Sequence, residues 1–152
     1  MNKLLTITIA CLFLSFFSCD KGEKILKDNV KEIEEYLEDN NLTAQRTDDD
    51  LFYIIEEEGN GIFPVETDRV TVDYNGYFTN GQLFDSSYER GTPLSIELTS
   101  VIRGWREGIP LFSKGGKGKL LVPSHLGYGE FDSNGIPGES VLIFDIELLD
   151  IN

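Results

Sequence analysis

The chain has 152 residues, a length that allows one domain with short extensions. Its 27 acidic residues outnumber its 13 basic ones, so the formal net charge at pH 7 is -14. This excess of negative charge argues against a nucleic-acid partner, because binding to phosphates requires a basic surface that displaces counterions. It equally argues against electrostatic docking on anionic lipid headgroups.

The N-terminal residues have the pattern of a targeting sequence. Lys3 provides a short basic start, and the apolar run at 4–17 is too short to span a bilayer comfortably, as in a secretory signal peptide. The run ends in a small residue, Ser18, followed by Cys19, which resembles the cleavage site of a bacterial lipoprotein. We therefore predict a lipoprotein signal peptide at residues 1–18 and lipidation of Cys19. An ordinary secretory signal is the alternative.

The chain contains only two cysteines, Cys11 inside the predicted signal and Cys19 at its end. The globular part therefore has no cysteine for a disulfide, for thiol catalysis or for a metal site. His125 is the only histidine. From this residue inventory we expect neither a metal nor a cofactor.

Residues 19–48 form a separate zone that links the predicted anchor to the globular part. Apolar residues recur there at three- and four-residue steps among Lys and Glu, which predicts an amphipathic helix ending near Asp39. This helix would pack on its own domain, act as a spacer, or pair with a second copy. The pattern covers barely two heptads, which favours the spacer over the dimer. The apolar positions are Ile25, Leu26, Val30, Ile33, Tyr36 and Leu37.

Residues 49–152 are the predicted globular domain. From Leu51 onward the periodicity changes to two, which is typical of strands with one buried face. Asn80-Gly81 marks a tight hairpin turn, and one short helix is predicted at 102–112, where Pro110 truncates it. The predicted fold class is α+β: a curled antiparallel sheet of about five strands wrapped over one short helix, with an N-terminal helical extension. The predicted strands are 52–57, 70–74, 94–98, 119–122 and 141–149.

Three short blocks contain the most informative residues of the chain. The first runs from Tyr74 to Phe84-Asp85-Ser86-Ser87, the second is Val101-Ile102-Arg-Gly-Trp105, and the third is Leu126-Gly-Tyr128-Gly129. In this order and at these spacings the blocks resemble the FKBP-type peptidyl-prolyl cis-trans isomerases. The resemblance covers roughly residues 51–152, almost the whole globular part.

The resemblance assigns the polar contacts with the substrate to a few groups. Tyr128 would donate its hydroxyl to a substrate carbonyl, as would the backbone N–H of Ile102. Asp85 would lie at the pocket edge, hydrogen-bonded to Tyr74 and Arg90, and would orient and polarise a twisted amide rather than transfer a proton.

The resemblance also implies an apolar pocket with Trp105 as its floor, on which a proline ring would rest. Ile136 would lie in a loop that overhangs it. The family often has an aromatic residue in the pocket at the position of Leu94. The wall formed by Leu94 would therefore be more flexible than an aromatic one. Taken singly, Phe84, Trp105 and Phe144 would be ordinary core residues. The remaining walls would be Tyr74, Phe84, Val101, Ile102 and Phe144.

The predicted function is therefore a peptidyl-prolyl cis-trans isomerase that assists the folding of extracytoplasmic proteins. Its expected partners are proline-containing polypeptides, FK506-like macrolides, and a membrane reached through the lipid anchor. The expected location is the bacterial cell envelope, lipid-anchored and facing the periplasm or the outer membrane. The alternative is a non-catalytic module that holds proline-containing or apolar segments. A pure scaffold could lose Asp85 or Tyr128 without cost, so their presence favours catalysis.

Overall fold

The computed structural model describes the backbone of residues 3–152 and the side chains from residue 21 onward. The predicted signal peptide at 1–18 and the predicted lipidation of Cys19 lie outside the residues whose side chains are described. Within the described part of the chain, no helix is sufficiently long and apolar to cross a membrane.

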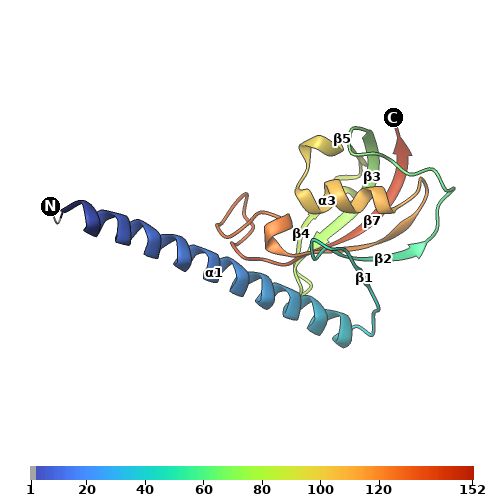
Figure 1. Ribbon diagram of the computed structural model, residues 1–152. Coiled ribbons are helices and arrows are strands. Elements are labelled where there is room, and N and C mark those ends of the chain that lie inside the picture. Colours follow the sequence, from blue (N-terminus) through green and yellow to red (C-terminus); the bar gives the residue numbers. More distant parts are fainter. Residues whose placement is uncertain (1–2) are drawn as a thin grey trace.

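A long N-terminal helix precedes a domain built on one sheet (Figure 1). The helix is α1 (Lys3–Asp39), and two short helices, α2 (Ser87–Arg90) and α3 (Arg103–Gly108), lie within the domain. Three 3-10 turns complete the helical elements: η1 (Leu98–Ser100), η2 (Ile109–Leu111) and η3 (Ser124–Leu126). The strands are β1 (Gln45–Arg46), β2 (Phe52–Glu57), β3 (Arg69–Tyr77), β4 (Leu83–Ser86), β5 (Leu94–Glu97), β6 (Lys117–Val122) and β7 (Leu142–Ile151).

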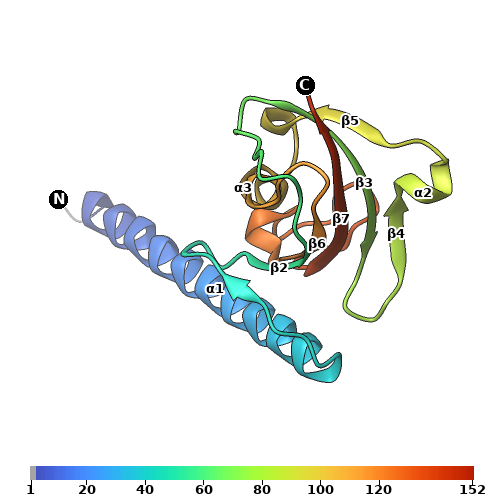
Figure 2. The same cartoon turned by 90° about the vertical axis from the view of Figure 1, so that its right-hand side faces the viewer.

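The sheet is antiparallel throughout and has the strand order β1-β2-β6-β7-β3-β4, with β5 also paired to β3. It curls around α3, as Figure 2 shows. The predicted fold class is confirmed, and each of the five predicted strands is present. The prediction missed β1, which has only two residues, and β4, whose sequence Leu83-Phe84-Asp85-Ser86 does not alternate.

Helix α3 packs closely on the concave face of the sheet. A Cβ added at Gly104 would come 2.5 Å from Val122 Cγ1, and one added at Gly108 would come 2.6 Å from Leu120 Cδ2. The two glycines therefore let the helix backbone approach β6. The α-helix ends at Gly108, and Pro110 lies in the 3-10 turn that follows, as its fixed φ and missing N–H predict.

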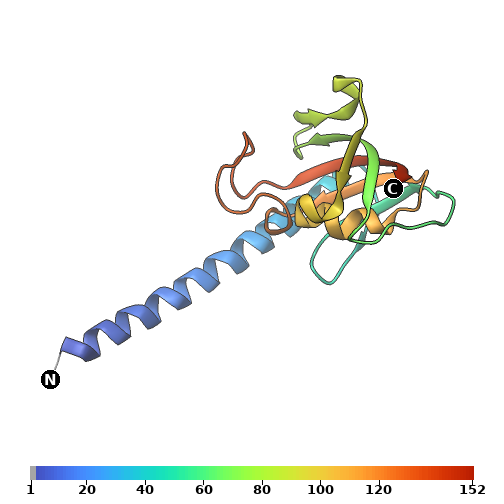
Figure 3. The ribbon, with the colours of Figure 1, turned by 90° about the horizontal axis from the view of Figure 1, so that it is seen from above.

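The second half of α1 covers the opposite, convex face of the sheet (Figure 3). Ile33 is fully buried there against Phe52, Leu121 and Ile143. Leu121 faces α1 while its neighbour Leu120 belongs to the core under α3, because successive strand residues point to opposite faces. The second half of α1 thus packs on its own domain, which is one of the arrangements considered for this helix from the sequence.

The close approach of α3 yields a stability prediction. We expect Gly104→Ala to lower the free energy of unfolding by about 1–3 kcal/mol, because the stiff, buried Val122 cannot move aside. Gly22→Ala in α1 is the matched control, since nothing lies within 4 Å of its added Cβ. Urea denaturation should show Gly22→Ala neutral or slightly stabilising through helix propensity. Equal effects at both positions would contradict the close packing.

Candidate functional site

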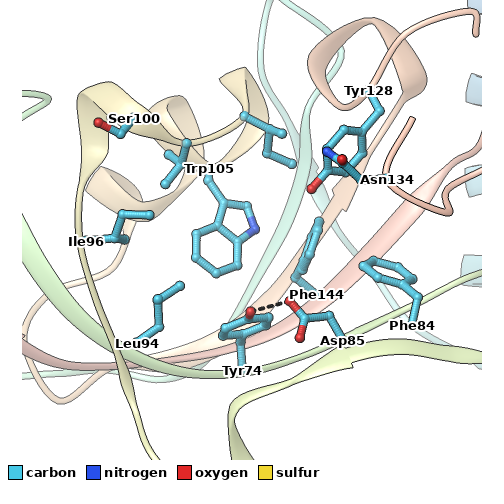
Figure 4. Close-up of a pocket in the computed structure, with 12 residues that line it drawn as sticks. Tyr74, Phe84, Asp85, Leu94, Ile96, Ser100, Trp105, Tyr128, Asn134 and Phe144 are labelled. Atoms are coloured by element: carbon cyan, nitrogen blue, oxygen red, sulfur yellow. Dashed lines mark hydrogen bonds between the residues drawn. The ribbon is translucent and has the colours of Figure 1, made fainter. Parts of the chain in front are cut away.

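A cavity of about 330 Å³ lies where α3 meets β3, β4, β5 and β7 (Figure 4). The concave face of the sheet supplies one side of it, and the segment after β6 supplies Tyr128 and Asn134 on another. Sequence-distant elements therefore converge on one hollow. Its lining residues are Tyr74, Phe84, Asp85, Leu94, Ile96, Ser100, Val101, Ile102, Trp105, Tyr128, Asn134 and Phe144.

Aromatic rings meeting edge to face form much of the cavity's apolar surface. The Trp105 ring centroid lies 4.9 Å from that of Tyr74 and 5.3 Å from that of Phe144, with interplanar angles of 89° and 81°. Phe84 meets Phe144 in the same way at 5.8 Å. Each such pair stabilises the arrangement by about 0.5–1.5 kcal/mol beyond its buried area. The rings thus hold one another in fixed orientations, and Trp105 is only 4% exposed.

Trp105 owes its position to the start of α3. Its backbone N–H donates to the carbonyl of Ile102 at 3.0 Å, so the first turn of the helix presents the indole to the cavity. The indole N–H has no hydrogen-bond partner among the described residues. Trp105 therefore also contributes one buried hydrogen-bond donor beside the cavity.

The polar edge of the cavity consists of Tyr74, Asp85 and Arg90. The Tyr74 hydroxyl donates to Asp85 Oδ2 at 2.5 Å, while Arg90 Nη1 pairs with Asp85 Oδ1. Arg90 Nη2 also donates to the Tyr74 hydroxyl at 2.9 Å, and its guanidinium lies 5.4 Å from the centroid of the Tyr74 ring. The side chains of Asp85 and Arg90 are 43% and 45% exposed, so solvent screens the ion pair. Its main consequence is the fixed orientation of the carboxylate.

The serines that follow Asp85 build the corner that brings Arg90 to it. Ser86 is the N-cap of α2 and accepts from the N–H of Glu89 at 3.2 Å. The fully buried Ser87 accepts from the Tyr74 N–H at 2.9 Å and donates to Asp73 at 2.6 Å, which joins α2 to β3. Local structure thus accounts for Ser86 and Ser87, while the carboxylate of Asp85 faces the cavity.

Both tyrosine hydroxyls at the cavity are held protonated. Burial, aided by the hydrogen bond to Asp85, raises the pKa of Tyr74 to about 12 although Arg90 opposes the shift. Burial and, secondarily, the charge of Asp85 also raise the pKa of Tyr128. At neutral pH the Tyr74 proton is committed to Asp85. The Tyr128 side chain is 38% exposed, and its hydroxyl remains a donor for a bound ligand.

Nine of the ten predicted site residues line this cavity, the exception being Ile136. That side chain, 5% exposed, borders an adjoining hollow of about 450 Å³, which also touches Phe84, Asp85 and Tyr128. Ile136 therefore lies beside the main cavity, in a hollow that shares lining residues with it. The roles assigned to the ten residues stay predictions.

Sequence reasoning missed three lining residues, Ile96, Ser100 and Asn134. Strand alternation alone would have found Ile96, since it lies two residues after Leu94 on the same face of β5. Asn134 gave no signal, because it belongs to an irregular loop in which its own φ is 52°. Among the side chains described, no three His, Cys, Asp or Glu residues come together as a potential metal site.

Known proteins resemble this chain in sequence and in fold. The family model described as FKBP-type peptidyl-prolyl cis-trans isomerase matches residues 61–149. The FKBP-type peptidyl-prolyl cis-trans isomerase FkpA of Buchnera aphidicola subsp. Acyrthosiphon pisum (strain APS) is 47% identical over 108 residues, 71% of this chain and 45% of that protein. The protein of that name from Escherichia coli (strain K12) is 43% identical over 133 residues, 86% of this chain and 49% of that protein.

A solved structure agrees with these sequence matches. The crystal structure of FkpA from Escherichia coli is similar with a TM-score of 0.75 at 38% identity, covering 100% of this chain and 73% of that chain. The present chain spans about half the length of the two curated relatives it matches.

The raised pKa of Tyr74 predicts how stability changes in alkali. The unfolded chain releases this proton near the ordinary value of 10.0 and the folded protein near 12, so the folded state binds more protons between these values. This contribution to stability is complete below pH 10 and is lost as the pH rises through 12. We expect the free energy of unfolding to fall between pH 8 and pH 11.

Urea denaturation of wild type and Tyr74→Phe at pH 8 and pH 11 checks this expectation. The fall should be smaller in the variant, which has no hydroxyl to titrate. Tyr53→Phe is the control, because that hydroxyl bonds Gln45 at the exposed edge of the sheet, and it should retain the full fall. An undiminished fall in Tyr74→Phe would contradict the assignment.

Proposed function

Because the chain belongs to the FKBP-type peptidyl-prolyl cis-trans isomerase family, we propose that it accelerates rotation about X-Pro bonds in other polypeptides. The observation that carries the proposal is the aromatic cavity based on Trp105, with Asp85 and the Tyr128 hydroxyl at its edge. This combination suits a reaction that needs an apolar slot and a few fixed polar groups. It requires no nucleophile and no exchange of protons with the substrate.

The chemical problem is the partial double bond of the amide. Its rotational barrier is about 18–20 kcal/mol, and uncatalysed X-Pro isomerisation takes tens of seconds or longer. A thousandfold acceleration requires the barrier to fall by only about 4 kcal/mol. Selective binding of the twisted amide, together with its removal from water, is a sufficient source for a reduction of this size.

In the proposed complex the proline ring rests on the Trp105 indole. The surrounding rings of Tyr74 and Phe144 exclude water from the amide, and water normally stabilises its charge-separated resonance form. Without that stabilisation the C–N bond loses double-bond character and twists more readily. Because Trp105 and Phe144 are both almost fully buried, the slot is rigid before the substrate arrives.

Polar groups at the edge would then favour the twisted state over the planar ones. The protonated Tyr128 hydroxyl donates to a substrate carbonyl, and the backbone N–H of Ile102 donates to another. The carboxylate of Asp85, oriented by Tyr74 and Arg90, places a negative field beside the twisting carbonyl carbon. Fixed dipoles of this kind act without the reorganisation that water would require.

The substrates we propose are proline-containing segments of proteins that fold outside the cytoplasm. Aromatic and aliphatic walls favour apolar residues before proline, and Leu94 leaves one wall more yielding than an aromatic side chain would. FK506-like macrolides would compete for the same cavity.

We further propose that the mature chain begins at a lipidated Cys19 and is anchored in the cell envelope of a bacterium, facing the periplasm or the outer membrane. The support is the pattern of residues 1–19: a basic start, a short apolar run, and a small residue before the cysteine. The acyl chains would supply the whole attachment, since a net charge of -14 does not favour an anionic membrane surface.

A protease-coupled assay of cis-to-trans isomerisation in a Leu-Pro peptide tests the activity. Tyr128→Phe removes the donor to the substrate carbonyl, and we expect kcat/KM to fall about tenfold, the equivalent of about 1.4 kcal/mol. Asp85→Leu should lower it at least as much, and a macrolide of the FK506 type should inhibit the wild type.

Tyr88→Phe is the matched control, because it removes a hydroxyl that bonds Glu147 outside the cavity. It should leave kcat/KM unchanged. A folded wild-type protein that gives no acceleration would refute the catalytic proposal.

The anchor has a separate test. Growth of expressing cells with an alkyne-tagged palmitate should label the wild-type chain and the Cys11→Ser variant. Cys19→Ser should carry no label, because the acyl acceptor is gone. Label that persists in Cys19→Ser would disprove lipidation at this residue.

A further inference from the structure

One buried polar side chain links α1 to the segment that carries Tyr128. Asn29, on the inner face of α1, is 4% exposed. Its Oδ1 accepts from the backbone N–H of Ser124 at 2.8 Å, and its Nδ2 donates to the backbone carbonyl of Glu139 at 2.9 Å. These partners lie 95 and 110 residues away in the sequence.

The two partners are the two ends of a single segment, which we call the rim segment (residues 124–139). It contains Tyr128 and Asn134, which line the main cavity, and it has little regular structure beyond η3. Gly129 closes it internally: its N–H donates to the Ser124 carbonyl at 2.8 Å, and its own carbonyl accepts from the Glu139 N–H at 2.9 Å. Asn29 therefore lies across the base of the segment and bonds both ends.

The backbone of Glu139 shows that the conformation is constrained where the two ends of the rim segment meet. Its φ is 63°, in the left-handed region that residues other than glycine seldom occupy. Such a conformation persists only where the surrounding structure determines it. The bond from Asn29 to the Glu139 carbonyl is one of the contacts that do so.

The chemistry of this position suits asparagine. A backbone N–H can only donate and a carbonyl can only accept, so the bridging side chain needs one acceptor and one donor on a short planar group. Aspartate would place a second acceptor against the Glu139 carbonyl. An aliphatic side chain would remove the partner of the buried Ser124 N–H and of the part-buried Glu139 carbonyl. Exposed ion pairs from Lys21 to Glu130 and Glu139 add contacts between α1 and the rim segment.

We propose that Asn29 is a positioning residue of the isomerase site, acting through the rim segment to keep the Tyr128 hydroxyl directed at the substrate carbonyl. The inference rests on the proposed isomerase function. It makes the second half of α1 part of the catalytic unit: the helical segment after the predicted anchor also holds one side of the cavity.

A double-mutant cycle in the full chain tests this role. Asn29→Ala, measured well below its unfolding temperature, should lower kcat/KM for the Leu-Pro peptide about tenfold. In a Tyr128→Phe background the same change should cost less than about twofold, because the group that Asn29 positions is already absent. The matched control is Asn40→Ala, which removes an exposed carboxamide just after the end of α1 that donates to the Tyr36 carbonyl. It should leave kcat/KM unchanged.

A purely structural role for Asn29 gives a different result. Asn29→Ala would then lower the unfolding temperature but leave kcat/KM of the folded protein unaltered, or lower it equally in both backgrounds. Either outcome would overturn the proposal.

Amide hydrogen exchange supplies a readout that does not depend on catalysis. In Asn29→Ala the N–H groups of Ser124, Gly129 and Glu139 should exchange at least tenfold faster, while those at the centre of β7 keep their wild-type rates. Unchanged exchange in the rim segment would overturn the positioning role even if the wild type is active. An inactive wild type with faster exchange in the variant would instead refute the isomerase function. It would still establish that Asn29 holds the two ends of the rim segment together.

Discussion

The close packing of α3 on β6 is the contact on which the rest of the site depends. Gly104 and Gly108 bring the helix backbone against Val122 and Leu120, and this depth sets the position of Trp105. Trp105 in turn contacts Tyr74 on β3 and Phe144 on β7, the two strands that pair along the centre of the sheet. The floor of the cavity is therefore part of the hydrophobic core, and its rigidity is a result of folding itself.

The two sides of the cavity are built by different means. The Asp85 side comes from neighbouring residues: Ser86 caps α2, and α2 returns Arg90 to Asp85 within five positions. The Tyr128 side comes from an irregular segment whose ends are bonded by Asn29, about a hundred residues away. A local motif thus holds the carboxylate, whereas a long-range contact with the N-terminal helix holds the hydroxyl. The Tyr128 side is therefore more sensitive to changes elsewhere in the molecule.

Much of the fold could be predicted because its signals are local. Alternation located β3 and β5, apolar runs located β2, β6 and β7, and Asn80-Gly81 located the hairpin between β3 and β4. Prediction failed where the local pattern was absent, at the two-residue β1 and at β4, whose residues serve the cavity and the α2 corner rather than one sheet face. Most of the lining set was predictable through family resemblance, but the place of Asn134 in it depends on a loop conformation, which residue spacing does not encode.

By itself, the sequence determined five of the strands and the end of α3 before Pro110, since these follow from the pattern of residues along the chain. The family and most of the cavity lining followed from the resemblance of the three blocks. The amphipathic pattern of α1 likewise predicted a helix. Only the tertiary structure decided where its apolar face would go: onto the convex side of the sheet around Ile33, with Asn29 bridging Ser124 and Glu139. The physical reason is that an apolar stripe specifies burial without specifying a partner. Likewise, the presence of an asparagine does not indicate which backbone groups, a hundred residues away, its side chain will bond.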